Sequence, residues 1–212
     1  PGHGESELLE EKQTMEQLAN HIKAALDTLN IKICALVGHS IGGYLTLMFH
    51  HLYPEMLSGF CLFHSHPFSD SEEKRKNRIR EIELIRDGKK NLVASVNIPN
   101  TFANENVAFF ANFTEKIKSV VSKTPDDGII ANIHAMMSRP DLSKSLADSQ
   151  IPFLLIAGRK DNLFDFNSIV PKIKLPLNSQ LVVLEKSGHM GFIEEKETSI
   201  NHIKNFLSKI NP

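Results

Sequence analysis

The sequence predicts an α/β fold in which a mostly parallel sheet is flanked by helices. Four apolar runs have the length and composition of buried strands, and they cover residues 31–37, 57–63, 153–157 and 181–184. Helical stretches alternate with these runs, which is typical of a parallel sheet. No convincing strand occurs in residues 66–150, so we expect this stretch to be a helical insertion between two strands of the core.

An amphipathic helix is predicted over residues 14–30, ahead of the first strand. Apolar residues recur there at helical spacing, and Thr14 and Gln17 form a capping box. The first two strands and the helix between them should then form a right-handed, parallel β-α-β unit. Later core helices are expected over residues 165–173 and 196–209.

The predicted insertion divides the chain into three regions. These are a first part of the core at residues 1–65, the insertion at 66–150, and a second part of the core at 151–212. Helices within the insertion are predicted over residues 69–90, 104–122 and 128–138. The first of them should present Ile79, Ile82 and Ile85 on one stripe, as a surface helix with an apolar underside does.

Composition and charge exclude several function classes. Of the 212 residues, 41% are hydrophobic, which is ample for a core, and 24 Lys and Arg against 25 Asp and Glu give a net charge of −1. Nothing in this balance favours nucleic acid or an anionic membrane as a partner, and no apolar run is long enough to span a membrane. Cys34 and Cys61 lie in apolar runs as small hydrophobic groups, so we expect a reducing, cytoplasmic location.

A serine stands in a glycine-rich turn at residues 38–43 (GHSIGG), between the first predicted strand and a predicted helix over 44–53. The spacing Gly-x-Ser-x-Gly fits a nucleophile elbow, where the serine backbone is strained and its neighbours must be small. Such a turn would expose Ser40 Oγ and aim the backbone N–H of Ile41 at a developing oxyanion. The alternatives are a helix entry without chemistry and a phosphate-binding turn, but neither the dinucleotide fingerprint nor the P-loop is present.

Three predicted strands lead into residues suited to nucleophilic catalysis, namely Ser40, Asp161 and His189. The carboxyl ends of parallel strands lie on one edge of a sheet, so these side chains can meet. A serine hydroxyl near neutral pH needs an imidazole to take its proton, and a carboxylate would fix the tautomer of that imidazole. Asp165 and Glu185 are rival acids, but Asp161 is preferred because it directly follows a strand and its glycine turn.

With these residues identified, the sequence resembles the α/β-hydrolase superfamily over essentially its whole length. Residues 1–6 resemble the turn after the family's fourth strand, 38–43 its elbow, 158–161 its acid loop and 187–189 its histidine loop. The helical insertion lies where members carry a lid. Members with a serine nucleophile include esterases, lactonases, C–C bond hydrolases and cofactor-free haloperoxidase-like proteins. The resemblance therefore implies a lidded, serine esterase-like member.

The resemblance also implies strands that this sequence does not contain. Members of the family have four strands ahead of this point, and the loop after the third supplies a second oxyanion N–H. Without them, the strand at 31–37 would have an unpaired apolar edge. We expect the functional protein to complete its sheet with an upstream segment or a second chain, and a homodimer is considered as well.

The remaining candidates concern substrate and metal binding. The candidate substrate-binding residues are His64, His66, Phe109, Phe110, Met136, Met137 and Met190. For the Phe and Met residues of the insertion, the alternative is that they pack the insertion against itself. The histidine pairs lack further ligands at suitable spacing, so no metal and no cofactor is predicted.

Three functional hypotheses follow. The first is a hydrolase that cleaves a small or medium carboxylic ester, with an apolar acyl or alcohol group, through an acyl-enzyme on Ser40. The second keeps the fold but changes the reaction to C–C hydrolysis or lyase chemistry, using basic residues such as Arg139 or Arg159, or to haloperoxidase-like chemistry. The third is a ligand-binding or interaction protein that retains the triad without turnover.

Overall fold

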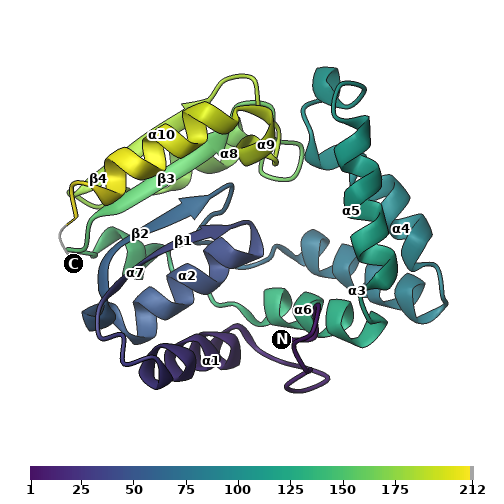
Figure 1. Ribbon diagram of the computed structural model, residues 1–212, viewed down its shortest axis with the longest axis horizontal. Coiled ribbons are helices and arrows are strands. Elements are labelled where there is room, and N and C mark those ends of the chain that lie inside the picture. Colours follow the sequence, from purple (N-terminus) through teal and green to yellow (C-terminus); the bar gives the residue numbers. More distant parts are fainter. Residues whose placement is uncertain (211–212) are drawn as a thin grey trace.

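The computed structural model describes residues 1–210, and at its centre lies a four-stranded parallel sheet (Figure 1). The strands are β1 (Cys34–His39), β2 (Leu57–Phe63), β3 (Phe153–Gly158) and β4 (Ser179–Leu184). They lie side by side in chain order, and each neighbouring pair is parallel. All four carboxyl ends therefore share one edge of the sheet, which confirms the predicted fold class.

The first strand begins at Cys34 rather than at residue 31, so its predicted start is wrong. Asn30 has a positive φ of 57°, and the N–H of Ile31 donates to a carbonyl of the preceding helix α1 (Met15–Thr28). This turn leaves Ile31 and Ile33 exposed ahead of the strand. An apolar run alone does not reveal where such a turn ends.

Burial separates the middle strands from the outer ones. Nearly every residue of β2 and β3 is buried, which explains their almost continuous apolar sequence. Among the described residues β1 and β4 are the edges, and Val37 of β1 is 42% exposed. The additional strand or second chain expected at the β1 edge stays a prediction.

Helices cover both faces of the sheet (Figure 1). Those of the core are α1, α2 (Ile41–Leu52), α8 (Phe166–Ile169), α9 (Gly191–Glu194) and α10 (Lys196–Leu207). Side chains alternate along β2, so Phe60 and Leu62 pack with α1 and α2, while Cys61 and Phe63 pack on the α10 side. The predicted capping box at the start of α1 is present. No helix within residues 1–210 has both the length and the apolarity needed to cross a bilayer.

Between β2 and β3 the described chain is helical. Its helices are α3 (Glu72–Arg86), α4 (Lys90–Asn97), α5 (Ala111–Lys123), α6 (Asp126–Ser138) and α7 (Ser143–Ala147). Ile82 and Ile85 of α3 are buried together with Ile130 and Ile133 of α6. The predicted stripe is wrong at Ile79, which is 46% exposed.

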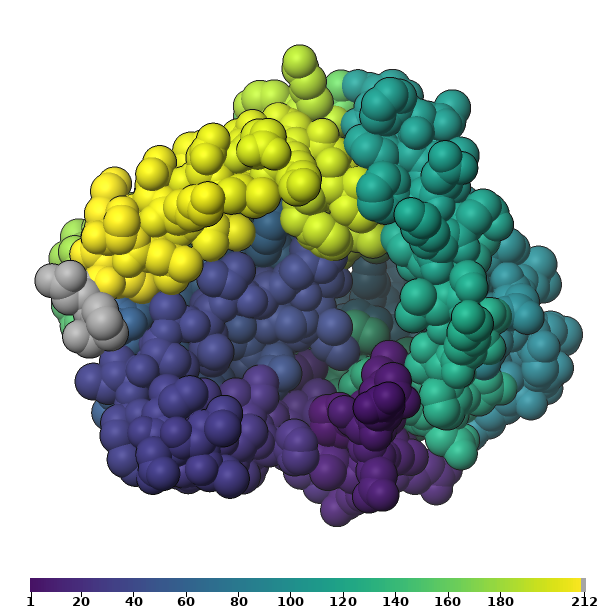
Figure 2. Space-filling view, viewed as in Figure 1, coloured from purple at the N-terminus to yellow at the C-terminus, as the bar shows by residue number. Residues whose placement is uncertain are grey.

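Most of the helical insertion lies beside the sheet, whereas α7 packs on one face of it, where Leu146 joins the main core. Helices α3 to α6 stand next to the carboxyl end of the strands (Figure 1). The space-filling view shows the surface hollowed where the insertion, the N-terminal residues and the C-terminal part of the core meet (Figure 2). The hollow adjoins the carboxyl ends of the strands.

Candidate active site

The elbow at the end of β1 has the strained backbone that its sequence predicts. Ser40 has φ 54° and ψ −118°, a conformation that non-glycine residues rarely adopt. The turn is held by a hydrogen bond of 2.9 Å from Ser40 N–H to Phe63 O on β2. A second bond of 2.9 Å runs from Gly43 N–H back to Ser40 O. Strain of about 1–3 kcal/mol persists only where the surroundings enforce it, as they do here.

Two glycines allow the strand and the helix to approach this closely. A Cβ on Gly38 would overlap the backbone of Gly42, and one on Gly43 would overlap Ser65, which follows β2. A Cβ on Gly42 would meet nothing within 4 Å. The close approach therefore depends on Gly38 and Gly43, and the expectation that Gly42 must be small to make room is wrong.

Ile41 is the first residue of α2. Backbone N–H groups in the first turn of a helix have no partner within the helix, and the helix dipole favours negative charge at this end. The N–H of Ile41 is thus available for an oxyanion that forms next to Ser40, the role predicted for it.

Asp161 and His189 are brought together from the ends of β3 and β4. His189 Nδ1 lies 2.7 Å from Asp161 Oδ2, and both side chains are buried. The other oxygen of Asp161 accepts the backbone N–H groups of Leu163 and Phe164 at 2.8 and 2.9 Å. These bonds fix the plane of the carboxylate and place it on the imidazole.

The protonation states follow from these contacts. Burial alone would raise the pKa of Asp161, but hydrogen bonds from His189 and His64 outweigh it and hold this pKa below its usual range. The carboxylate is therefore charged near neutral pH and takes the Nδ1–H of His189. The remaining nitrogen, Nε2, is buried and has no hydrogen-bond partner within residues 1–210. In neutral His189 it is the atom with a free lone pair.

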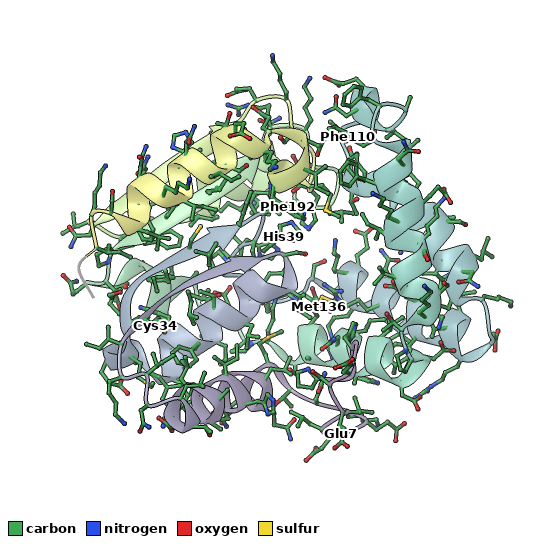
Figure 3. The ribbon with its side chains drawn as sticks, in the orientation of Figure 1. Glu7, Cys34, His39, Phe110, Met136 and Phe192 are labelled. Atoms are coloured by element: carbon green, nitrogen blue, oxygen red, sulfur yellow. The ribbon has the colours of Figure 1, made fainter. Side chains whose placement is uncertain are left out.

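His39 connects the histidine loop to the elbow. Its Nε2–H donates to the backbone oxygen of His189 over 2.8 Å, and the two ring centroids lie 5.0 Å apart. Burial lowers the pKa of His39 to about 4, so its ring is neutral near pH 7. His39 precedes Ser40 in the chain, and this bond therefore holds the backbone of His189 next to the candidate nucleophile. Figure 3 shows His39 and Phe192 together at this end of the sheet.

The rival carboxylates have other partners. Asp165 accepts the N–H of Asn167 and caps helix α8. Glu185 forms an ion pair with Arg159 at 3.0 Å on the surface. Of the three carboxylates considered from the sequence, Asp161 is the one with a hydrogen bond to His189.

The insertion holds the histidine loop in place, which the sequence did not reveal. The N–H of His189 donates to Thr101 O at 2.7 Å. Glu194 accepts the N–H of Gly188 at 2.8 Å and the N–H of Ala103 at 2.9 Å, so it joins the loop to the insertion. The bonds that reach Thr101 and Ala103 link residues far apart in the chain, and a single sequence carries no signal for them.

The predicted substrate-binding histidines both have partners within the protein. His64 is 1% exposed and contacts Asp161, with its Nδ1 3.1 Å from Oδ2. His66 accepts the N–H of Phe68 at 3.2 Å, and its other ring nitrogen lies 3.3 Å from the hydroxyl of Tyr44. Burial, with Arg139 nearby, lowers the pKa of His66 to about 4. Their predicted contact with substrate stays a prediction.

The apolar candidates are spread over the insertion and the histidine loop. Phe109 is 82% exposed, and Phe110 stacks on Phe102 with centroids 5.5 Å apart. Met136 packs between the main core and the α3–α6 cluster. Met137 lines a separate cavity of about 220 Å³ between the N-terminal segment and α6. Met190 directly precedes α9.

One residue beside the site was missed from the sequence. Phe192 is partly exposed, and its ring lies 4.9 Å from that of His39. Phe192 therefore gives the histidine loop an apolar surface next to the elbow. Its position three residues after His189 is the signal that would have found it.

His64, Asp161 and His189 have donor atoms within 4.8 Å of one another, the spacing that a metal ion would need. The two contacts to Asp161, at 3.1 and 2.7 Å, have the lengths of hydrogen bonds. A metal ion would have to replace the protons that join these three side chains. A carboxylate that accepts one hydrogen bond from each of two imidazoles accounts for this geometry.

Comparison with known proteins identifies the family and the fold of the chain. The chain matches the Ndr family over residues 1–210. It is 26% identical over 212 residues to 3-oxoadipate enol-lactonase 1 of Acinetobacter baylyi, an alignment that covers 99% of this chain and 76% of the relative. A thermophilic esterase from Thermogutta terrifontis superimposes with a TM-score of 0.92 at 27% identity, covering 100% of this chain and 78% of the esterase.

A second solved structure supports the fold alone. The enol-lactonase from Burkholderia xenovorans LB400 has a TM-score of 0.87 at 22% identity, over 98% of this chain and 78% of that protein. The family match runs through nearly the whole sequence, and both solved structures superimpose on nearly all of the chain. The chain therefore belongs to the Ndr family and has the fold of the α/β-hydrolase superfamily.

Proposed function

We propose that this protein is a serine hydrolase that cleaves a small or medium carboxylic ester through an acyl-enzyme on Ser40. The observation that carries the proposal is the 2.7 Å bond between Asp161 and His189, whose backbone is joined to the strained serine elbow through His39. Relatives named as an enol-lactonase and an esterase support ester chemistry. The same geometry without these relatives would fit acyl transfer in general.

In the first half of the reaction, Ser40 Oγ attacks the ester carbonyl while His189 Nε2 takes the hydroxyl proton. The charged Asp161 stabilises the imidazolium that forms. The N–H of Ile41, at the N-terminus of helix α2, donates to the oxyanion. Collapse of the tetrahedral intermediate breaks the bond to the alcohol, which leaves with the proton from His189, and the acyl group stays on Ser40.

The second half repeats these steps with water as the nucleophile. His189 Nε2 takes a proton from the water as it attacks the acyl-enzyme, and then returns a proton to Ser40 Oγ as the acid leaves. The balance requires only water, so this proposal needs no metal and no cofactor. The helical insertion would serve as the lid over the hollow, and Phe192 would offer an apolar contact to the substrate.

The experiment that tests the proposal replaces Ser40 with alanine in the full-length protein. We expect turnover of p-nitrophenyl esters to fall by about 10⁴-fold or more, because the nucleophile and its acyl intermediate are lost. A fluorophosphonate probe should label the wild type and fail to label Ser40→Ala. The matched control is Ser122→Ala, an exposed serine on α5, which should keep wild-type turnover and labelling.

Undiminished ester hydrolysis in Ser40→Ala would remove Ser40 from the mechanism. Absence of labelling and turnover in the wild type would favour the third hypothesis, a binding protein that retains the triad. The C–C hydrolase hypothesis receives less support, because the basic residues it would use have internal partners. Arg139 is buried against Asp70, and Arg159 pairs with Glu185.

A further inference from the structure

Asp161 receives a second imidazole besides that of His189. We propose that His64 is a positioning residue, a neutral imidazole that donates its Nδ1–H to Asp161 Oδ2 and so holds the carboxylate on His189. Its effect on turnover rests on the proposed function. The hydrogen bond itself does not, and the experiments below separate the two.

The geometry places the two imidazoles on one oxygen atom. His64 Nδ1 lies 3.1 Å from Asp161 Oδ2, and His189 Nδ1 lies 2.7 Å from the same atom. The side chains of His64 and Asp161 are both 0% exposed, so no water competes for this contact. Together with the two backbone N–H groups on Oδ1, the carboxylate has four donors, which fills its hydrogen-bonding capacity.

His64 occupies its position at a cost that packing alone does not explain. Its φ is 50°, a left-handed conformation that is strained for a non-glycine residue. Its Nε2 is buried and has no partner within residues 1–210, which adds a second penalty. Costs of this kind persist at functional sites, where one contact has to be made.

The surrounding backbone is shaped to admit the ring. A Cβ on Gly158 would lie 2.8 Å from His64 Cε1, and a Cβ on Gly191 would lie 2.5 Å from its Nε2. Phe63 stacks on the opposite side with ring centroids 4.8 Å apart. Two glycines from separate segments thus leave room for an imidazole in one orientation.

The proton on His64 can be assigned from its neighbours. Burial lowers the pKa of His64, and the hydrogen bond to Asp161 only partly opposes this, so the ring is neutral near pH 7. The N–H of Gly158 also points at Nδ1 from 3.2 Å, which would favour the opposite tautomer. A hydrogen bond to a charged carboxylate is about twice as strong as one between neutral groups, so the Nδ1–H tautomer prevails.

Few charged or titratable groups face His64. Asp161 carries the negative charge, and Glu194 lies further off. The rings of His189 and His39 lie 5.5 and 5.8 Å away. Losing the donor at position 64 would leave more negative charge on Asp161 Oδ2 toward His189. The pKa of His189 should therefore rise in a variant that lacks the donor.

The first test needs no substitution. Nitrogen-15 NMR of the imidazoles in the wild-type protein reports which ring nitrogen carries the proton. We expect His64 to carry it on Nδ1, with a low-field proton signal typical of a bond to a carboxylate. A proton on Nε2 instead would overturn the proposal, because Nδ1 could then only repel Asp161.

The second test compares His64→Leu, which removes the donor, with His64→Asn, whose amide N–H lies near the place of Nδ1. In His64→Leu we expect kcat to fall by up to about 10²-fold, the loss expected when a catalytic group is misplaced, with KM nearly unchanged. His64→Asn should recover most of kcat. An NMR titration of His189 in a Ser40→Ala background should show its pKa raised by His64→Leu and restored by His64→Asn.

Wild-type kcat with an unmoved titration of His189 in His64→Leu would refute the proposal. An equal loss in both variants with an unmoved titration would assign His64 to packing and refute it too. If His64→Leu does not fold, the tautomer of His64 in the wild type still decides. If Ser40→Ala keeps ester hydrolysis, the proposed function fails, whereas the tautomer and titration results for His64 stand on their own.

Discussion

Two buried aspartates each bind two basic side chains, and the comparison separates chemistry from architecture in this protein. Asp161 at the strand ends binds the imidazoles of His64 and His189. Asp70 at the base of the insertion binds the guanidinium groups of Arg78 and Arg139, at 2.7 and 2.8 Å. Both carboxylates are almost fully shielded from solvent, at 0% and 1% side-chain exposure.

The Asp70 cluster ties the start of the insertion to the end of α6. Arg139 follows α6, and besides Asp70 it donates to Phe68 O at 3.0 Å and to Met136 O at 2.7 Å. Its guanidinium also lies 3.9 Å above the ring of Tyr44 on α2. The start of the insertion, the end of α6 and the elbow helix therefore meet at the buried guanidinium of Arg139.

The difference lies in what the partners can do with a proton. A guanidinium stays charged at every relevant pH, so the Asp70 cluster is permanent. An imidazole gains and loses a proton near neutral pH, so the Asp161 cluster can follow a reaction. Burial would raise the pKa of Asp70, but hydrogen bonds and charge from Arg78 and Arg139 hold it below its usual range. We infer that Asp70 has a structural role and that Asp161 takes part in the reaction.

The largest effect should come from Asp161→Asn. An amide carries no charge to stabilise the imidazolium and can present a donor to Nδ1, which favours the wrong tautomer of His189. We expect kcat for ester hydrolysis to fall by about 10⁴-fold. Steady-state kinetics with circular dichroism as a check on folding will measure it. A loss of less than about tenfold would mean that the Asp161–His189 bond is not part of catalysis.

The next largest effect should be on stability, in Asp70→Ala. Removing one partner of a buried ion cluster leaves uncompensated charge, which costs about 3–5 kcal/mol. Urea denaturation will measure the free energy of unfolding. The matched variant Arg139→Lys keeps the charge but loses the planar donor geometry, and should fall between wild type and Asp70→Ala. An unchanged midpoint in Asp70→Ala would show that the cluster does not hold the insertion.

A smaller effect should appear in the pH dependence of stability. The pKa of folded His39 is about 4, below the ordinary value of 6.5, so unfolding takes up a proton between these values. The stability that neutral His39 contributes is fully present above pH 6.5 and is lost as pH falls toward 4. Replacing His39 with leucine should reduce the slope of unfolding free energy by about 1.4 kcal/mol per pH unit in this window.

Asp70→Ala is the control for that slope, because arginine does not titrate in this range and the pKa of Asp70 is held below its ordinary value of 3.8. Its denaturation curves should shift downward at every pH between 5 and 6.5 with the wild-type slope. A slope that changes in Asp70→Ala and not in His39→Leu would reverse the assignment of the two regions.

The sequence predicted what depends on local pattern. The bounds of β2 match the predicted 57–63, because this strand is buried on both faces and reads as one apolar run. The strained turn at Ser40 could be anticipated because the glycine spacing is specific. The start of β1 could not, since the turn at Asn30 depends on how helix α1 ends.

What the sequence missed depends on contacts between distant segments. His64 could be placed at a strand end, but its bond to Asp161 follows from the register of β2 on β3, in which Phe63 pairs with Ile156. The hydrogen bonds from His189 N–H to Thr101 O and from Ala103 N–H to Glu194 likewise join the core to the insertion. Contacts of this kind arise from the fold and leave no pattern in the local sequence.

The most direct test is an experimental structure of the full-length protein after reaction with a fluorophosphonate. We expect phosphorus bonded to Ser40 Oγ, a phosphoryl oxygen about 3 Å from the N–H of Ile41, and His189 Nε2 within hydrogen-bond reach of the adduct. An adduct on another residue, or His189 held away from Ser40 with its bond to Asp161 intact, would contradict the account.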